Sequence, residues 1–283
     1  MNTDYKTVAV HVNESPHTLS RVKLASKWAV KFDTHLVGVA ATGLPPSFYL
    51  GGLSGEGAAV VPAYIDALRD RAETALAMSE AVAAKDGVRS FEKRMIEEEP
   101  GVALCLQARY CDLLIIGQDD PDDQVMMQTK KVAEYVLLNS INQVLIVPHA
   151  GEFASVGQRV LIAWDGSMEA ARAVHGAIPV LRRAGLVQVA VFDPKIGAGA
   201  HGEEPGADIA LFLARHGVRV DVSRHATGND IDVGNAILSH AADYGADLLV
   251  MGGYGHSRFR EVMLGGVTRT VLQSMTMPVL MSH

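Results

Sequence analysis

Short apolar runs and segments with helical spacing alternate along the whole chain. Residues 112–117 (Asp-Leu-Leu-Ile-Ile-Gly) form an apolar run of strand length, whereas residues 19–32 place Val22, Ala25 and Ala29 on one face of a helix. Strands are predicted in the same way at 7–12, 36–40, 89–96, 112–117, 144–147, 159–163, 187–192, 218–224, 248–251 and 279–281, and helices at 19–32, 63–84, 101–109, 132–138, 169–184, 208–215, 233–244 and 267–274. This alternation predicts an α/β fold with a parallel sheet and helices on both of its faces.

The two halves of the chain repeat this order, and the repeat is visible in the residues. Residues 111–117 (Cys-Asp-Leu-Leu-Ile-Ile-Gly) match residues 246–252 (Ala-Asp-Leu-Leu-Val-Met-Gly), and residues 144–146 match residues 279–281, both at an offset of 135 residues. No gap is therefore needed between the buried strand and the last strand of each half. We predict two similar domains.

The predicted domains span residues 1–150 and 156–283, with a junction near 150–158. Between its first strand and the matched buried strand, the first half is longer than the second by 17 residues. The glycine- and proline-rich segment 43–62 is the natural place for this extra length, and it reads as a long loop.

The stretch with the most chemistry is 252–266, which follows a buried strand and precedes a helix. It reads Gly-Gly-Tyr-Gly-His-Ser-Arg-Phe-Arg-Glu-Val-Met-Leu-Gly-Gly. Glycines let a backbone approach a ligand closely, and the start of the following helix offers unpaired N–H groups to an anion. His256 and Arg258 add charge that suits a phosphate. The alternative is an ordinary tight turn, since a short glycine motif alone is weak.

Composition narrows the classes of function. The 283 residues carry a formal net charge of -7, which argues against sequence-independent nucleic-acid binding. No apolar run is long enough to cross a membrane, and the amino-terminal residues show no signal-peptide pattern. The two cysteines, Cys105 and Cys111, form neither a disulfide framework nor a zinc motif. We therefore expect a soluble cytoplasmic protein with no nucleic-acid or membrane partner.

These motifs resemble those of the universal stress protein family. Residues 163–167 (Ala-Trp-Asp-Gly-Ser) resemble the family's opening strand, and Gly252-x2-Gly255-x9-Gly265 resembles the nucleotide-binding motif of its ATP-binding branch. Residues 277–280 (Met-Pro-Val-Leu) also look like the family. The resemblance covers the chain as a tandem pair, strong in the second half and weaker in the first.

The resemblance implies a fold as well as a ligand. It implies two tandem doubly wound domains with five-stranded parallel sheets, of the adenine nucleotide alpha hydrolase-like type, packed as an internal pseudo-dimer. The family dimerises through its last strand, and a further homodimer of this chain is left open. Its glycine-motif branch binds ATP or AMP, here with Mg2+ as a potential companion of the phosphates.

Carried over residue by residue, the resemblance assigns roles in the second half. Asp165 contacts the adenosine, and a carboxylate at the end of a strand can accept hydrogen bonds from ribose hydroxyls. Ala163 and Val191 flank the adenine ring. Gly252, Gly255 and Gly265 shape the phosphate loop, and the N–H of Val267 and the hydroxyl of Thr268 meet the phosphates. His256, Arg258 and Gly266 lie in the same stretch and complete the predicted site.

One position departs from the family pattern. The family has Ser or Thr directly after the third glycine of the motif, and this chain has Gly266. The backbone N–H remains, but a hydroxyl that would contribute on the order of 1 kcal/mol is missing. The change is expected to weaken triphosphate binding or to favour AMP or another ligand.

The first half lacks this chemistry. Residues 117–123 (Gly-Gln-Asp-Asp-Pro-Asp-Asp) stand where the second half has 252–258, and Asn13 stands in place of Asp165. Lys130 and Lys131 replace the last two glycines. Four carboxylates repel a phosphate, so we expect a degenerate, non-binding partner domain. A divalent-cation site on these aspartates is the alternative to a solvated acidic loop.

The expected function is a stress-response protein whose second domain binds an adenine nucleotide. No general base or metal-binding carboxylate is evident beside the glycine loop, so no defined reaction is expected, and slow ATP hydrolysis is the limit. Ser167 lacks the nucleophile-elbow motif and is predicted to cap the following helix. None of His201, His216, His225 and His240 has recognised metal-ligand spacing, so no metal site is predicted.

Two alternatives stay open. One is a nucleotide-free interaction or scaffold protein, which the loss of the hydroxyl at Gly266 would favour. The other is a binder of a different small molecule, in which the loop 43–62 covers a pocket. Fold alone cannot choose between them.

Overall fold

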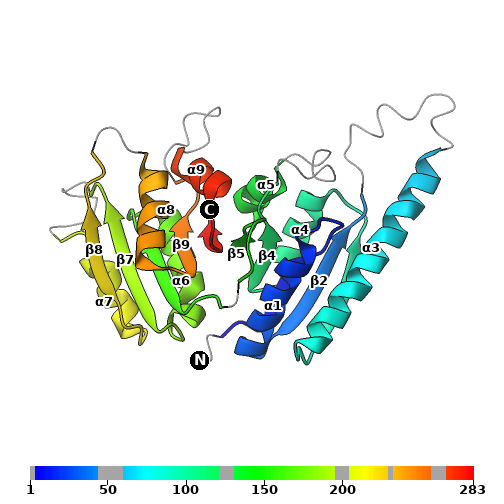
Figure 1. Ribbon diagram of the computed structural model, residues 1–283, viewed down its shortest axis with the longest axis horizontal. Helices are drawn as coiled ribbons and strands as arrows, with labels where there is room; N and C mark the ends of the chain where they lie inside the picture. The colour runs from blue at the N-terminus through cyan, green and yellow to red at the C-terminus, as the bar shows by residue number, and fades with distance from the viewer. Residues whose placement is uncertain are drawn as a thin grey trace. The chain divides into compact units, whose positions relative to one another are not determined.

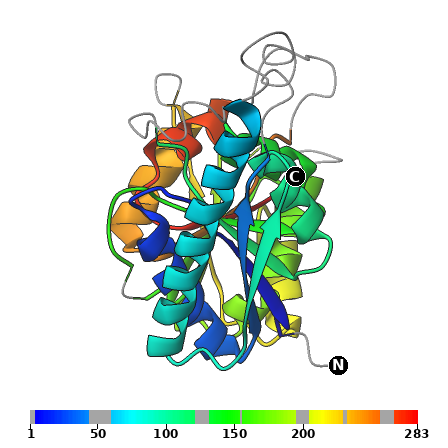
Figure 2. The ribbon, with the colours of Figure 1, turned by 90° about the vertical axis from the view of Figure 1, so that its right-hand side faces the viewer.

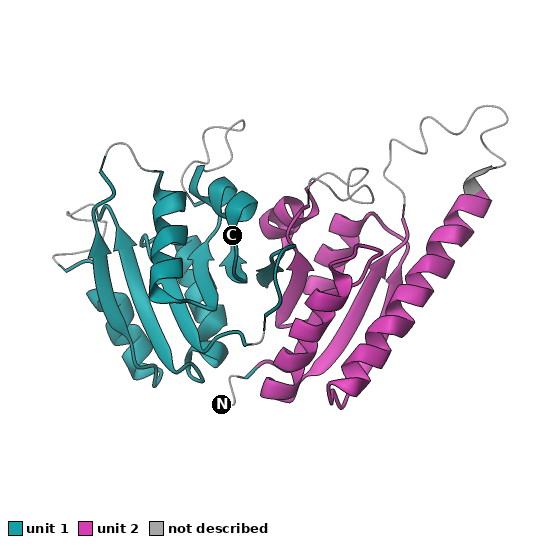
Figure 3. Ribbon diagram, viewed as in Figure 1, with its two compact units in different colours: residues 1–4, 143–283 teal, residues 5–142 magenta. Residues whose placement is uncertain are grey.

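A computed structural model describes residues 4–43, 60–120, 131–153, 155–194, 204–228, 232–255 and 266–283. The predicted loop 43–62 lies mostly outside the described residues. The chain divides into two compact units, the amino-terminal unit (residues 5–142) and the carboxy-terminal unit (residues 1–4 and 143–283), coloured magenta and teal in Figure 3. Each unit is considered by itself below.

The amino-terminal unit alternates strands and helices as predicted. Its elements are β1 (Thr7–His11), α1 (Thr18–Phe32), β2 (His35–Ala41), α3 (Val60–Lys85), β3 (Phe91–Ile96), α4 (Pro100–Ala108), β4 (Leu113–Gly117) and α5 (Val132–Asn139). The strands lie in the order β3-β2-β1-β4, and all pairs are parallel. Helices α1 and α3 pack together over one face, and α4 and α5 pack together over the other, as Figures 1 and 2 show.

The carboxy-terminal unit repeats this arrangement and adds a strand. Its elements are β5 (Gln143–Val147), β6 (Arg159–Ala163), α6 (Met168–Leu181), β7 (Leu186–Phe192), α7 (Ala207–Arg215), β8 (Asp221–His225), α8 (Val233–Tyr244), β9 (Leu248–Gly252), α9 (Gly266–Ser274) and β10 (Val279–Ser282). The strand order is β5-β10-β9-β6-β7-β8. All pairs are parallel except β5 with β10, which is antiparallel. The last strands of the two sequence halves therefore pair with each other.

The apolar runs predicted as strands form the core of each unit. All side chains from Leu113 to Ile116 in β4 and from Leu248 to Met251 in β9 are buried. A strand buried on both faces reads as a continuous apolar run, which is how the sequence pattern located these two. The α/β fold class is confirmed, and most predicted elements agree with the structure within one or two residues.

The strand order of each unit reverses at one point, which is where open α/β sheets generally bind a ligand. In the carboxy-terminal unit the chain runs outward from β6 to β7 and then returns to β9 on the other side of β6. Loops at the carboxyl ends of β6 and β9 therefore diverge, and ligands of open α/β sheets bind at such a switch point. The glycine loop predicted from sequence follows β9. In the amino-terminal unit, β1 and β4 form the matching switch point.

Candidate functional site

The turn after β6 is ordered by one carboxylate. Ala163 ends the strand, and Asp165 is exposed two residues later. Asp165 Oδ1 accepts hydrogen bonds from the backbone N–H of Ser167 at 3.0 Å and from its hydroxyl at 2.6 Å. Ser167 Oγ in turn accepts from the N–H of Ala170 at 3.1 Å, which confirms the predicted cap of α6. Asp165 is thus held at the end of β6 through Oδ1, and no described residue hydrogen-bonds its other oxygen, Oδ2.

The turn after β9 requires glycine for a steric reason. A Cβ on Gly252 would lie 2.5 Å from the backbone nitrogen of Ala170 and 2.9 Å from the carbonyl carbon of Glu169. Real Cβ atoms do not approach backbone this closely, so only glycine lets the end of β9 pass the start of α6. Tyr254, two residues on, has a positive φ of 61°. The first predicted loop glycine is therefore explained by close packing of two backbone segments.

The start of α9 is tied to the same turn. Thr268 is buried, and its Oγ1 accepts a hydrogen bond from the N–H of Tyr254 at 3.1 Å. Gly266 is exposed, and a Cβ there would meet no described atom within 4 Å. The first N–H groups of an α-helix have no partner within the helix, so the N-terminus of α9 presents donors beside the Tyr254 turn. The structure thus brings Gly252, Tyr254 and Thr268 together.

Other predicted site residues are buried or half-buried, or lie outside the described part. Val191 is fully buried in β7, and its Cγ2 lies 3.2 Å from where a Cβ on Gly206 would stand. Its side chain therefore packs towards the start of α7. Val267 is half-buried at the start of α9. His256, Arg258 and Gly265 lie outside the described residues.

Sequence reasoning missed one acidic residue at this site. Glu169 lies in the first turn of α6, and its Oε2 is 3.0 Å from the position that a Cβ on Gly255 would take. The sequence made no carboxylate evident beside the glycine loop, and the structure places that of Glu169 there. Its position four residues after Asp165, in the first turn of a helix that starts at the same edge of the sheet, is the signal that could have revealed it.

In the amino-terminal unit the end of β1 is filled by a buried arginine. Arg21 is 3% exposed, and its Nε donates to the carbonyl of His11 at 2.7 Å. Its Nη2 donates to Asn13 Oδ1 at 2.8 Å and to Thr18 Oγ1 at 3.1 Å. A Cβ on Gly117 would overlap Nη1 of the same side chain. The guanidinium thus occupies the space between the ends of β1 and β4.

The buried arginine also shapes the state of its neighbour. His11 is buried, and its pKa is lowered to about 3, first by the loss of hydration and then by the charge of Arg21. The imidazole is therefore neutral at physiological pH. The end of β1 holds one cation, on Arg21.

The start of α5 in the same unit is capped by a carboxylate. Asp119 Oδ1 accepts a hydrogen bond from the N–H of Ala133 at 3.3 Å. Burial raises the pKa of Asp119 to about 6, although the N–H groups of Ala133 and Val132 act in the opposite direction. Next to it, Asp120 Oδ2 lies 3.0 Å from Nε2 of His17. A side chain of this unit therefore occupies the N-terminus of α5, whereas at the first residue of the matching helix, α9, a Cβ on Gly266 would meet no described atom within 4 Å.

The described histidines of the carboxy-terminal unit contact aromatic rings and backbone carbonyls. Among the described residues, no three His, Cys, Asp or Glu side chains come together closely enough to hold an ion. The rings of His225 and His240 lie 4.1 Å apart between centroids and are inclined by 51°, which is a tilted ring contact. His216 bonds a backbone carbonyl of its own helix, and His201 lies outside the described residues.

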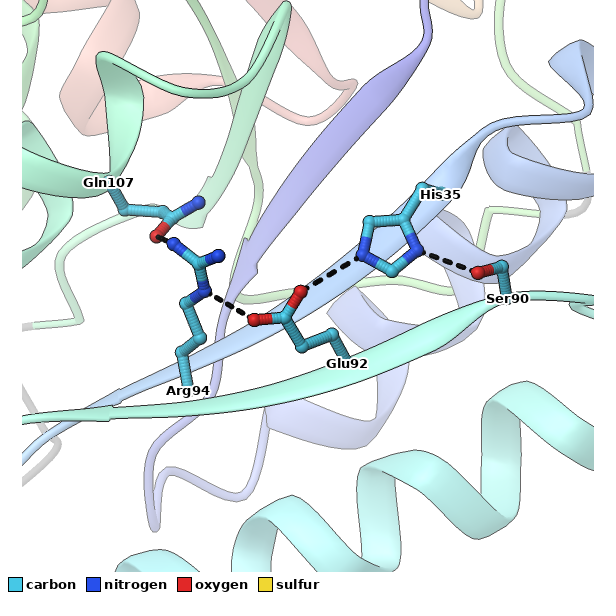
Figure 4. Close-up of polar contacts among 5 residues, drawn as sticks. All are labelled: His35, Ser90, Glu92, Arg94 and Gln107. Atoms are coloured by element: carbon cyan, nitrogen blue, oxygen red, sulfur yellow. Dashed lines mark hydrogen bonds and ion pairs between the residues drawn. The ribbon is translucent and has the colours of Figure 1, made fainter.

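A separate polar chain lies at the opposite, amino end of the strands in the amino-terminal unit. His35 at the start of β2 contacts Ser90 Oγ at 2.7 Å through Nδ1 and Glu92 Oε2 at 3.2 Å through Nε2 (Figure 4). Arg94 Nε pairs with Glu92 Oε1 at 2.5 Å, and Arg94 Nη1 donates to Gln107 Oε1 at 3.0 Å. This series of side-chain contacts cross-links β2, β3 and α4, and it lies away from the switch point at the carboxyl ends of β1 and β4.

Comparison with known proteins finds the family match in the second half of the chain, which also contains the predicted site. A model of the universal stress protein family matches residues 157–283. Over 45 residues the chain is 44% identical to the curated universal stress protein Slr1230 of Synechocystis sp., a segment that spans 16% of this chain and 16% of that relative. Among the described residues, no helix combines the length and apolarity that a membrane-spanning segment needs.

Solved structures extend the likeness in fold to the whole chain. A universal stress protein from Archaeoglobus fulgidus DSM 4304 aligns over 98% of this chain and 95% of its own, with 18% identity and a TM-score of 0.75. A shorter universal stress protein from Archaeoglobus fulgidus, solved in complex with dAMP, aligns with 50% of this chain and 97% of its own, with 15% identity and a TM-score of 0.36.

Proposed function

The chain belongs to the universal stress protein family through its carboxy-terminal domain, residues 157–283, and on that premise we propose that this domain binds an adenine nucleotide. The site is the carboxyl end of β6 and β9. The amino-terminal unit is a non-binding partner. We propose no defined catalytic reaction, with slow ATP hydrolysis as the limit.

The observation that carries the proposal is the open N-terminus of α9 beside the glycine turn. Gly252 and Tyr254 bring the turn against α6 and α9, while no described atom lies within 4 Å of where a Cβ on Gly266 would stand at the first position of α9. Unpaired N–H groups at a helix start, and the positive end of its dipole, suit a phosphate. In the amino-terminal unit the matching donors already face Asp119. This contrast supports the assignment to the second domain.

The nucleoside end of the site rests on Asp165. The carboxylate is exposed at the carboxyl end of β6 and is oriented through two hydrogen bonds from Ser167 to one of its oxygens. The other oxygen can accept from a ribose hydroxyl. In the amino-terminal unit the matching residue, Asn13, instead accepts from Arg21 and Thr18. Ala163 and Val191 remain the proposed neighbours of the adenine ring.

The ligand is proposed to be ATP or AMP, with Mg2+ as a companion of the longer phosphate chain. A net charge of -7 is consistent with a protein that has no nucleic-acid partner and acts in the cytoplasm. Whether two chains associate through a further surface can be read from the mass of the protein in solution.

Calorimetric titration with ATP, ADP, AMP and dAMP in the presence of Mg2+ tests the proposal. We expect saturation near one nucleotide per chain. Asp165→Ala should weaken binding by at least tenfold, because it removes the ribose acceptor. Gly255→Asp should abolish it, because it places a second carboxylate beside Glu169.

Asn13→Ala is the matched control, since it changes the same position in the amino-terminal unit. It should leave the affinity unchanged. Protein verified to be free of nucleotide that takes up none of the four ligands would overturn the proposal and favour a nucleotide-free interaction protein. Equal losses with Asn13→Ala and Asp165→Ala would overturn the assignment to the second domain.

A further inference from the structure

Glu169 stands against the turn that is proposed to hold the phosphates. Its Oε2 is 3.0 Å from the position of a Cβ on Gly255, and its Cβ is 3.0 Å from the position of a Cβ on Gly252. The side chain is half-buried. Within the residues that the structure describes, Glu169 makes no hydrogen bond and no ion pair. A carboxylate without a cationic partner therefore faces the backbone of the turn.

A described cation on the same helix is engaged elsewhere. Arg172, one helical turn after Glu169, donates from Nη1 to the carbonyl oxygen of His283 at 2.9 Å. Asp165, four residues before Glu169, bonds Ser167. Asp165 and Glu169 therefore add two carboxylates to the turn after β6 and the start of α6.

The repeat shows that this placement is a property of the fold. Residue 17 matches residue 169 because β1 and β6 begin and end 152 residues apart, and residue 120 matches residue 255 at the offset of 135. In the amino-terminal unit these positions hold His17 and Asp120, which touch at 3.0 Å. In both units the side chain at the start of the helix lies close to the matching position of the turn: His17 contacts Asp120, and Glu169 lies beside Gly255.

The turn connects this carboxylate to the start of α9. Tyr254, the neighbour of Gly255, donates to Thr268 Oγ1 in the first turn of α9. A phosphate at the N-terminus of α9 would consequently lie near Glu169. Each further phosphate on the ligand adds negative charge to that neighbourhood.

We propose that Glu169 is a specificity-determining residue that makes this site favour an adenine nucleotide with one phosphate over one with three. The inference rests on the proposed nucleotide site. The positive end of the α9 dipole and its N–H groups balance a single phosphate. The longer chain of ATP brings additional charge against a carboxylate that has no described counter-ion.

Coulomb's law sets the scale of this preference. Two unit charges about 7 Å apart repel in water enough to weaken binding about threefold. ATP carries about two more negative charges than AMP, so Glu169 should shift the ATP-to-AMP affinity ratio by about tenfold. A lower effective dielectric at the protein surface would enlarge the effect.

The experiment measures dissociation constants for AMP and ATP by calorimetry in buffer with EDTA. Glu169→Gln keeps the size of the side chain and removes its charge. We expect both nucleotides to bind more tightly to this variant than to the wild type, and the gain in affinity for ATP to exceed the gain for AMP by about tenfold. Asp208→Asn, which removes an acidic residue from the first turn of α7, is the matched control and should change neither affinity.

Salt and magnesium provide a second measurement that a merely structural role would not move. In the wild type, higher ionic strength or added Mg2+ should narrow the gap between ATP and AMP, because each screens or neutralises charge. In Glu169→Gln the difference between the affinities for ATP and AMP should be small at every ionic strength and with or without Mg2+.

The outcomes separate the two proposals. If the wild type binds AMP and the ATP-to-AMP ratio is the same in Glu169→Gln, the role of Glu169 is refuted and the nucleotide site stands. If neither nucleotide binds to either protein, both proposals fail. ATP binding that appears only in Glu169→Gln would support both.

Discussion

The two units end their central strands in different ways. At the carboxyl ends of β1 and β4, the amino-terminal unit places the buried guanidinium of Arg21 and the carboxylate of Asp119. At the matching positions the carboxy-terminal unit has Ala173, which is fully buried, and Tyr254, whose N–H bonds Thr268. The same fold thus encloses its own charged groups in one copy and leaves donors exposed in the other.

The difference teaches that two copies of one fold can satisfy the polar groups at the ends of their central strands in different ways. Asp119 meets the N–H groups at the start of α5, which are the groups that an anion would otherwise meet. Arg21 bonds Asn13, which matches the exposed Asp165 of the other unit. Among the described residues of the amino-terminal unit, an internal anion and an internal cation thus meet polar groups at the ends of β1 and β4.

The largest expected effect comes from removing the internal cation. Arg21→Met should lower the free energy of unfolding by about 3–4 kcal/mol, because buried acceptors on His11, Asn13 and Thr18 lose their donor. Urea unfolding followed by circular dichroism measures the change.

Arg89→Met is the matched control for that variant. Arg89 pairs with Asp33 on the surface, and its side chain is 85% exposed. Its replacement should cost less than about 0.5 kcal/mol. Equal effects at Arg21 and Arg89 would mean that the buried guanidinium does not hold the end of β1.

The second largest effect on stability is expected when the glycines that end β4 and β9 are replaced by alanine, and its size should differ between the two. Gly252→Ala should destabilise the protein by about 3 kcal/mol and abolish nucleotide binding, because its Cβ would collide with the backbone of α6. Gly117→Ala should cost about 1–2 kcal/mol, since the obstacle there is the end of the Arg21 side chain.

Gly266→Ala serves as the control because a Cβ at this position meets no described atom within 4 Å. Its stability should change by less than about 1 kcal/mol. Thermal unfolding of the three variants tests this order. A Gly252→Ala protein as stable as Gly266→Ala would show that β9 and α6 do not pack as closely as described.

The third effect is a pH dependence of the free energy of unfolding that arises from Asp119 in the amino-terminal unit. The pKa of Asp119 is raised from 3.8 to about 6, first by burial, so the folded state binds its proton more tightly than the unfolded state. The resulting stabilisation is complete below pH 3.8 and is lost as the pH rises through about 6. Relative to Asp119→Asn, the wild type should therefore lose about 2 kcal/mol between pH 4 and pH 7.

Unfolding free energies of the two proteins across this pH range provide the measurement. Asp33→Asn, at a side chain that is 76% exposed, should show no such pH-dependent difference from the wild type. A difference that is constant with pH for Asp119→Asn would contradict the raised pKa.

The smallest effect on stability is expected at Glu92 in β3, near the amino end of the strands. This end of the sheet is not where the two units differ. The pKa of Glu92 is lowered first by its hydrogen bond to Arg94 and then by that to His35. Its contribution is therefore present above its ordinary pKa of 4.5 and is lost as the pH falls below it. Because the side chain is 40% exposed, Glu92→Gln should cost only a few tenths of a kcal/mol.

Melting temperatures of Glu92→Gln and the wild type at pH 3 and pH 7 check this expectation. A loss above about 1 kcal/mol at pH 7 would show that the polar chain contributes more than a surface pair normally does.

The sequence by itself determined the elements and their order. Apolar runs located the buried strands, helical spacing located the helices, and the offset of 135 residues located the repeat. Ser167 was identified as a helix cap from its place just before the predicted helix. These features depend on residues a few positions apart, so the local pattern contains them.

Only the tertiary structure decided which side chains meet at the ends of the strands. Glu169 and Gly255 are far apart in sequence, as are Arg21 and Gly117, and each pair is joined by neighbouring strands of one sheet. The pairing of β5 with β10 likewise joins the two halves of the chain. Spacing along the chain does not state the direction of a side chain from a distant element, so the filled site and the open one became distinguishable only in the folded protein.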